Sequence, residues 1–495
     1  MGHARKGLVL GILLTTAIGS GIVALILVIV ETRDVYLPPE TKYGMVFDAG
    51  SSHTALFVYR WPAGKENDTG IVSQALACSV KGPGISYYRE EPTQAGESLR
   101  DCMREALGLI PDHLQRGTPT FLGATAGMRL LRLQNSSQAD RLFEEISKTL
   151  RQFPVDFRGA QLLTGNEEGA FGWITINYLL ESLVKYSFAG KWMPPTAAEL
   201  VGSLDLGGAS TQITFRPQSP SGDPSTQEDF RLYGGNYTVY THSYLCYGRD
   251  QALKMLQAHL VQASNSSRVD HPCYPSGFQE TLLLEGLYDS PCARPPKAYN
   301  PQSEILLRGT GDPEACFSAV RTIFNFSSCG GRKDCGFNGV FQPAVSGHFY
   351  AFSAFYYTFD FLNLTKGQSL SVTNATVWEF CKRNWDEMEL SYPDQKKWLH
   401  NYCPTAVYIL TLLMDGYKFT SESWSTISFC KQAADTDIGW SLGYMLNLTN
   451  MIPSEEPAGS RAQNRDVWIA AVFFVVLAVS LTTGALAVQY FGLPA

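Results

Sequence analysis

Charged residues are scarce in this chain, and they are missing altogether from two long stretches near its ends. Asp, Glu, Lys and Arg make up 17% of the 495 residues, and the formal net charge is -7. The sequence also lacks any long run of Lys or Arg. Nucleic acid is therefore not expected as a partner, because proteins that bind it present clustered basic residues.

The two uncharged stretches are long enough to cross a lipid bilayer. Leu8 to Val30 and Val467 to Leu493 contain no Asp, Glu, Lys or Arg, and a transmembrane helix needs about 20 predominantly apolar residues. The first stretch exceeds the core of a signal peptide, which has about 7 to 15 residues, so it is interpreted as a retained anchor. A buried core helix is the alternative for each stretch.

Basic residues before the first stretch set the expected topology. Arg5 and Lys6 favour a cytoplasmic N-terminus, and a second span would return the C-terminus to the cytosol and leave the middle outside the plasma membrane. Small residues in both spans allow helix packing and homo-oligomers. We expect tails at 1–7 and 492–495, transmembrane helices at 8–30 and 467–491, and linkers at 31–42 and 454–466.

Cysteine is absent from both spans, and no Cys or Cys/His set has convincing zinc-finger spacing. All 11 cysteines lie in the middle, which indicates disulfides formed in an oxidising compartment. Because the count is odd, one cysteine has no partner within the chain.

Asn-x-Ser/Thr sequons are also confined to the middle and predict a glycoprotein. The eight sequons are those of Asn67, Asn135, Asn236, Asn265, Asn325, Asn363, Asn374 and Asn447.

A short motif occurs twice in the middle region. Asp-Ala-Gly-Ser-Ser-His-Thr at 48–54 recurs as Asp-Leu-Gly-Gly-Ala-Ser-Thr at 205–211, each between β-prone runs. Glycine lets backbone N–H groups converge on a ligand, and the hydroxyls beside them suit phosphate oxygens. Each Asp is positioned to hold a hydrated divalent cation. The alternative is two ordinary hairpins, whose turns favour the same residue types.

Two further segments lie between these loops. Small residues at 123–128 precede Arg129, with Thr125 as a hydroxyl donor for phosphate; a packed strand-to-helix turn explains them equally well. Glu167 and Glu168 stand at the head of an apolar helix expected over Glu168 to Lys185. Interaction with the helix dipole is the alternative to a catalytic role.

These segments resemble the apyrase family, the ecto-nucleoside triphosphate diphosphohydrolases, and especially its cell-surface members with two anchors, of the liver and intestinal type. Its five signature regions match residues 47–54, 123–131, 165–181, 203–215 and 437–453, the last containing Trp440. The resemblance implies an α/β fold of two RNase-H-like halves around a nucleotide cleft, as in actin, sugar kinases and Hsp70. We expect halves at 43–165, completed by about 430–453, and at 166–429 with disulfide-rich insertions.

The resemblance also implies extracellular hydrolysis of nucleoside tri- and diphosphates to the monophosphate, by in-line attack of an activated water. Glu168 matches the catalytic base, Ser210 and Gln212 match residues that orient the water, and Asp48 and Asp205 match those that hold Ca or Mg through its waters. Arg249 and Tyr357 match the pair that sandwiches the nucleobase, although Tyr356 is adjacent. The phosphate-binding shell corresponds to Ser51, Ser52, His53, Thr125, Ala126, Gly207, Gly208 and Ala209.

For the cysteines, the family pattern implies five disulfides and leaves Cys430 unpaired. The implied pairs are Cys78–Cys102, Cys246–Cys292, Cys273–Cys316, Cys329–Cys335 and Cys381–Cys403.

Two other classes of protein were weighed against this interpretation. An adhesive ectodomain without catalysis would be expected to lack Glu168 or one loop Asp, and both aspartates are present. An actin-like kinase or chaperone would work in the cytosol, where disulfides are rare.

Overall fold

The computed structural model describes residues 2–29, 32–36, 40–187, 191–193, 195, 200–218, 222–264, 266–454, 459–463 and 465–491. Within these ranges the chain forms two compact units. One unit joins the two ends of the chain, Met1–Glu40 and Glu455–Ala495, and the other spans Thr41–Ser454.

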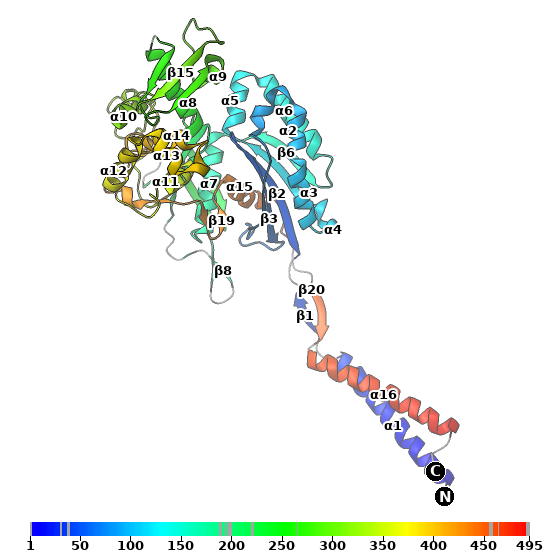
Figure 1. The fold of residues 1–495 in the computed structure, drawn as a ribbon. Helices are drawn as coiled ribbons and strands as arrows, with labels where there is room; N and C mark the ends of the chain where they lie inside the picture. Colours follow the sequence, from blue (N-terminus) through cyan, green and yellow to red (C-terminus); the bar gives the residue numbers. More distant parts are fainter. Residues whose placement is uncertain are drawn as a thin grey trace. The chain divides into compact units, whose positions relative to one another are not determined.

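The unit of the chain ends contains the two apolar helices. α1 (Gly2–Ile29) and α16 (Arg465–Phe491) pack against each other, as Figure 1 shows, and Lys6 Nζ donates to the carbonyl of Gln489 at 3.1 Å. Both are long and apolar enough to cross a membrane. The segments expected as linkers contain β1 (Thr32–Tyr36) and β20 (Gly459–Gln463), which pair antiparallel.

The large unit is built on two sheets that share the arrangement of their central strands, and the second sheet has one strand more. The first has the order β4-β3-β2-β5-β6, and the second has β11-β12-β10-β9-β16-β17. The strands β2 and β9, which carry Asp48 and Asp205 near their ends, lie inside their sheets. Each pairs antiparallel with the strand that follows it in the chain and parallel with a later strand. The bounds are β2 Thr41–Ala49, β3 Thr54–Pro62, β4 Ser73–Ser79, β5 Pro119–Ala124, β6 Asp156–Leu162, β9 Gly202–Leu206, β10 Ser210–Phe215, β11 Gln227–Leu232, β12 Gly235–Leu245, β16 Phe349–Ser353 and β17 Ile427–Phe429.

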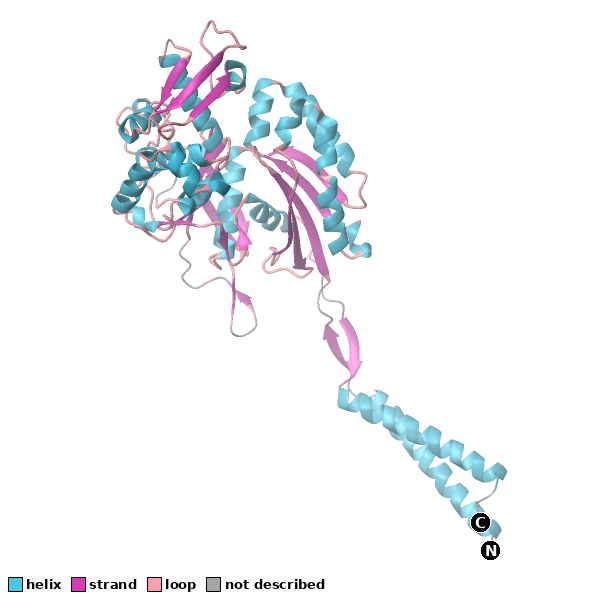
Figure 2. Ribbon diagram, viewed as in Figure 1, coloured by secondary structure: helices cyan, strands magenta, loops and turns pink. Residues whose placement is uncertain are grey.

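Helices pack on the first sheet over a core that includes Met45, Phe47 and Leu56. Figure 2 shows them along this sheet. The elements are η1 Ile85–Glu90, α2 Pro92–Ser98, α3 Arg100–Leu109, α4 Asp112–Gln115, α5 Ala126–Gln134 and α6 Ser136–Leu150. Leu99 separates two consecutive helices, α2 and α3.

Two helices lie between the sheets and connect the halves (Figure 1). α7 (Gly165–Leu179) follows β6 of the first sheet and packs on β9, β10 and β12 of the second. α15 (Trp440–Thr449) follows the second sheet and packs on α7, β2 and β3. α7 ends at Leu179, short of the expected Lys185. The halves therefore exchange helices, which explains how residues near the C-terminus complete the first half.

The rest of the second half carries most of the disulfides. β13 (Arg268–His271), β14 (Gln279–Leu283) and β15 (Glu304–Gly309) form a small sheet, and β7 (Lys185–Tyr186) with β8 (Trp192–Met193) and β18 (Gln432–Ala433) with β19 (Thr436–Asp437) form short hairpins. The remaining helices are α8 Arg249–Ala263, α9 Leu284–Tyr288, α10 Pro313–Arg321, α11 Ala354–Phe361, α12 Leu370–Cys381, α13 Trp385–Ser391 and α14 Leu399–Thr411.

Five disulfides are present, and they join the same pairs that the family resemblance implies; Cys430 is a half-buried free thiol. Among the sequon asparagines, Asn447 is half-buried within α15, and Asn265 lies outside the described residues. The exposed ones are Asn67, Asn135, Asn236, Asn325, Asn363 and Asn374.

Candidate active site

The two copies of the duplicated motif face each other. The first loop closes where Ala49 pairs with Thr54, and the second where Leu206 pairs with Thr211. A Cβ atom on Gly208 would stand 2.6 Å from Ser51 Oγ of the opposite loop. Any side chain at this glycine would therefore require the Ser51 hydroxyl to move.

The backbone N–H groups of both loops are available to a ligand. In the described part of the chain, those of Ser51, Ser52, Gly208 and Ala209 make no backbone hydrogen bond. Thr125 precedes α5, whose N-terminus adds further N–H groups, and its own N–H donates to the carbonyl of Ala49 at 3.2 Å. Converging N–H groups of this kind bind anions.

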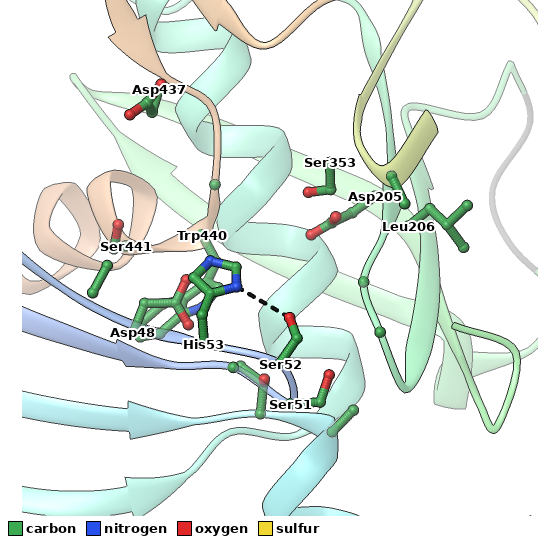
Figure 3. Close-up of a pocket in the computed structure, with 18 of the residues that line it drawn as sticks. Asp48, Ser51, Ser52, His53, Asp205, Leu206, Ser353, Asp437, Trp440 and Ser441 are labelled. Atoms are coloured by element: carbon green, nitrogen blue, oxygen red, sulfur yellow. Dashed lines mark hydrogen bonds between the residues drawn. The ribbon is translucent and has the colours of Figure 1, made fainter. Parts of the chain in front are cut away.

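A cavity of about 680 Å³ lies between the loops. It is lined by every residue that the family resemblance assigns to catalysis, phosphate, metal or nucleobase, except Gln212. Figure 3 shows Asp48 and the Ser51–His53 loop on one side and Asp205 with Ser353 on the other. Ser52 Oγ and His53 Nδ1 are 3.0 Å apart.

Asp48 and Asp205 have no cationic partner among the described residues, and Asp205 Oδ1 is sealed from solvent without a hydrogen bond. Burial raises the pKa of Asp48 to about 7; the Trp440 indole opposes this rise, and the charge of Asp205 adds to it. Burial also raises the pKa of Asp205 to about 6, against the effect of the Ser353 hydroxyl. Two uncompensated carboxylates at one cavity are chemically suited to a cation.

Glu168 lies in the first turn of α7 with 8% of its surface exposed. It forms an ion pair with Arg129, whose Nη2 also donates to Ser210 Oγ at 3.2 Å. Arg129 Nη1 donates to Ser243 Oγ at 3.4 Å. Gln212 Nε2 donates to the same two hydroxyls, at 2.7 Å to Ser210 and 2.9 Å to Ser243. These side chains form one buried network around the carboxylate.

The surroundings of Glu168 shift its pKa in opposite directions. Burial raises its pKa to about 8; the charge of Arg129 lowers it, and those of Asp205 and Asp48 raise it. Cationic charge near the aspartates would therefore favour the ionised carboxylate.

The adjacent Glu167 has a different environment. Its Oε2 accepts from Thr164 N at 2.8 Å and from Thr164 Oγ1 at 2.9 Å, and Thr164 Oγ1 in turn accepts from Glu167 N. This reciprocal capping box satisfies the N-terminus of α7. Glu167 thus caps the helix, whereas Glu168 lines the cavity.

Three aromatic or cationic side chains lie at the outer part of the cavity. Arg249 begins α8, and its Nε donates to Asp250 Oδ1 at 2.7 Å. Tyr357 lines the cavity with 53% of its surface exposed, whereas its neighbour Tyr356 is not among the lining residues. Trp398 joins them at the cavity wall.

Sequence motifs did not assign several of these residues. Arg129 closes the small-residue run at 123–128, and this proximity was its only signal. Ser243 lies within β12, and Trp398 immediately precedes α14, neither within a motif. Their roles depend on contacts between distant segments.

Comparison with known proteins agrees with this geometry. Residues 35–461 match the GDA1/CD39 (nucleoside phosphatase) family. The chain is 60% identical to ectonucleoside triphosphate diphosphohydrolase 8 of Bos taurus, over 100% of each sequence, and 47% identical to ectonucleoside triphosphate diphosphohydrolase 2 of Mus musculus, over 92% of each.

Among solved structures, a nucleoside triphosphate hydrolase from Neospora caninum superposes with a TM-score of 0.58 at 16% identity, covering 85% of this chain and 93% of that one. The predicted two-part α/β fold and the predicted family are therefore confirmed. This chain is a member of the GDA1/CD39 family of nucleoside phosphatases.

Proposed function

We propose that this protein hydrolyses nucleoside tri- and diphosphates, one terminal phosphate at a time, to the monophosphate and inorganic phosphate. The observation that carries the proposal is a single cavity in which two facing phosphate-type loops, two uncompensated aspartates and the buried Glu168 meet. The names of the relatives describe the same substrate class.

The phosphate chain binds between the two loops. Free N–H groups of both loops, the hydroxyls of Ser51, Ser52 and Thr125, and the N-terminus of α5 beginning at Ala126 supply donors. His53, Gly207, Gly208 and Ala209 complete the lining. Such preorganised donors neutralise the charge that phosphoryl transfer spreads over the phosphate oxygens.

A divalent cation, Ca or Mg, fits the aspartate pair. Within the part of the chain that the structure describes, Asp205 Oδ1 is a buried acceptor without a partner, and neither aspartate forms an ion pair. Among the described residues no third His, Cys, Asp or Glu joins them in a cluster. Asp48 and Asp205 would therefore hold a hydrated ion whose other ligands are water and phosphate oxygens. When bound, the ion supplies positive charge that neutralises the phosphates.

Glu168 acts as the general base. Its carboxylate accepts a proton from a water molecule as the water oxygen attacks the terminal phosphorus in line with the departing oxygen; the P–O anhydride bond breaks, and the proton leaves with solvent. Ser210 and Gln212 orient the water: Ser210 lines the cavity, and Gln212 Nε2 holds the Ser210 hydroxyl by donating to it at 2.7 Å. A positioned base of this type contributes about 10² to 10⁴ in rate.

The nucleobase lies between Arg249 and Tyr357. Stacking between a guanidinium and an aromatic ring does not depend on the hydrogen-bonding edge of the base. The site is therefore expected to accept purine and pyrimidine nucleotides.

The catalytic unit is proposed to lie outside the plasma membrane, held by α1 and α16 as two spans with both termini in the cytosol. The five disulfides and the exposed sequon asparagines support this placement. Extracellular nucleotides involved in purinergic signalling would then be substrates, and helix contacts between spans would allow homo-oligomers.

Phosphate release from extracellular ATP and from ADP by intact cells tests the proposal. Cells expressing the protein should release phosphate from both nucleotides, chelation of divalent cations should abolish release, and Ca or Mg should restore it. Release only after permeabilisation contradicts the topology. No release under any condition contradicts the enzymatic proposal.

A further inference from the structure

A second cavity adjoins the phosphate cavity. It has a volume of about 540 Å³ and is lined by residues of α8, α11 and the start of α14. Among the described residues, three side chains line both cavities: Arg249, Tyr357 and Trp398. A nucleotide with its phosphates between the loops and its base at Arg249 therefore has its base at this junction.

Trp398 presents a large ring to solvent from a fixed backbone. Its side chain is 47% exposed. Its N–H donates to the Gln395 carbonyl at 2.9 Å, and its carbonyl accepts from Asn401 N at 2.9 Å. The helix that it precedes, α14, is tied to α12 by the disulfide between Cys381 and Cys403. The backbone that carries this ring at the cavity wall is thus held by hydrogen bonds and by a disulfide in the following helix.

Cationic side chains flank this ring. The Arg249 guanidinium carbon lies 5.9 Å from the ring centroid, and Lys397 Nζ lies 4.7 Å from it. Arg249 is also held by Asp250 at 2.7 Å. A planar base that stacks on the Arg249 guanidinium is therefore within reach of the indole, and indole is the strongest cation–π partner among the aromatic side chains.

We propose that Trp398 contacts the nucleobase and forms a third wall of the base site, beside Arg249 and Tyr357. The inference rests on the proposed hydrolysis of nucleotides and adds a residue that determines affinity for the base. Because the indole contacts the face of the base and not its hydrogen-bonding edge, the contact strengthens binding of any nucleotide. It leaves binding of a polyphosphate without a base unchanged.

Kinetics with and without a base test the inference. Trp398→Ala should raise KM for ATP about 5- to 150-fold, the range for loss of one aromatic partner from a stacked base, with kcat close to wild type. Trp398→Phe should restore most of the affinity. The inhibition constant of tripolyphosphate, measured as a competitor of ATP, should not change in either variant.

Trp378 provides a matched control. Like Trp398 it has a lysine near its ring, with Lys382 Nζ 5.9 Å from the centroid, but Trp378 lines neither of the two cavities. Trp378→Ala should leave KM for ATP unchanged. Titration with AMP in the presence of a chelator should quench the tryptophan fluorescence of the wild type and of Trp378→Phe, and this quenching should be lost in Trp398→Phe.

An unchanged KM for ATP in Trp398→Ala would overturn the inference. A rise in the inhibition constant of tripolyphosphate as large as the rise in KM for ATP would also overturn it. Quenching that persists in Trp398→Phe would do the same. A wild-type protein that hydrolyses no nucleotide would refute the proposed function instead, and the AMP titration would still decide the role of Trp398.

Discussion

Replacing Glu168 by Gln tests the proposed base directly. The amide keeps the size of the carboxylate and an oxygen that accepts from Arg129, but it does not take a proton from water. Turnover should therefore fall by about 10² to 10⁴, the usual contribution of a positioned base. Nucleotide affinity should remain, because the two loops and the Arg249–Tyr357 pair are unchanged.

The structure also limits how far this substitution disturbs the fold. Removing one partner of a buried ion pair typically costs about 3 to 5 kcal/mol. Arg129 would keep its hydrogen bonds to Ser210 at 3.2 Å and Ser243 at 3.4 Å, and it would retain an oxygen acceptor at the substituted position. The free energy of unfolding should therefore decrease by less than that range, which thermal denaturation of both proteins would measure.

Glu167→Gln is the matched control one residue away. Gln is accepted at this position of a capping box, so the main loss is the charge near the helix N-terminus, worth about 0.3 to 1 kcal/mol. Purified variants should be compared for kcat and for nucleotide affinity measured without turnover. An inactive Glu167→Gln, or near-complete turnover in Glu168→Gln, would refute the mechanism.

Three further predictions concern the metal, the pH profile and the disulfides. Asp48→Ala and Asp205→Ala should each raise the Ca or Mg concentration needed for half-maximal activity and lower the maximum; unchanged metal dependence in both would remove these carboxylates from the metal site. Arg129→Met should shift the acid limb of the kcat/KM profile to higher pH, because the guanidinium charge lowers the pKa of the Glu168 carboxyl and its loss raises that pKa; a limb that does not move contradicts this coupling. Cys78 and Cys102 should be recovered as one linked peptide pair without reduction, and removal of the bridge should cost about 2 to 5 kcal/mol; alkylation of either thiol in the native protein contradicts the pairing.

Short, local patterns made the fold predictable. The duplicated turn between β-prone runs depends on the nearest neighbours of Asp48 and Asp205, and both copies form the expected strand, loop and strand. The spans were equally accessible to prediction, because apolar length alone defines them.

Features that depend on distant contacts were not predicted. Arg129 and Glu168 meet because α5 and α7 converge on the cavity, and Trp398, immediately before α14, lines the same cavity. The pairing of β1 with β20 joins two polar segments separated by most of the chain, and neither had a strong strand pattern.

The two halves share the strand pairing around β2 and β9, but the duplicated motifs differ at the positions proposed to carry the chemistry. Aligning Asp48 with Asp205 places His53 opposite Ser210 and Ala55 opposite Gln212. The hydroxyl and amide proposed to orient the water are therefore present only in the second copy. The first copy retains the donors for phosphate and one carboxylate for the cation.

The exchanged helices show the same asymmetry and explain why only one half has a carboxylate at the position of the proposed base. Glu168 is the fourth residue of α7, and the fourth residue of α15 is Gly443. A Cβ atom on Gly443 would lie 2.0 Å from the carbonyl oxygen of Phe171, because α15 crosses α7 there. Trp440, in the first turn of α15, fills the space beside Gly123, where a Cβ atom would lie 2.3 Å from its ring. Close packing between the two central helices thus excludes a carboxylate from the position that corresponds to Glu168. In the proposed mechanism, the duplicated fold would therefore bind a phosphate chain from both sides but activate water from one side only.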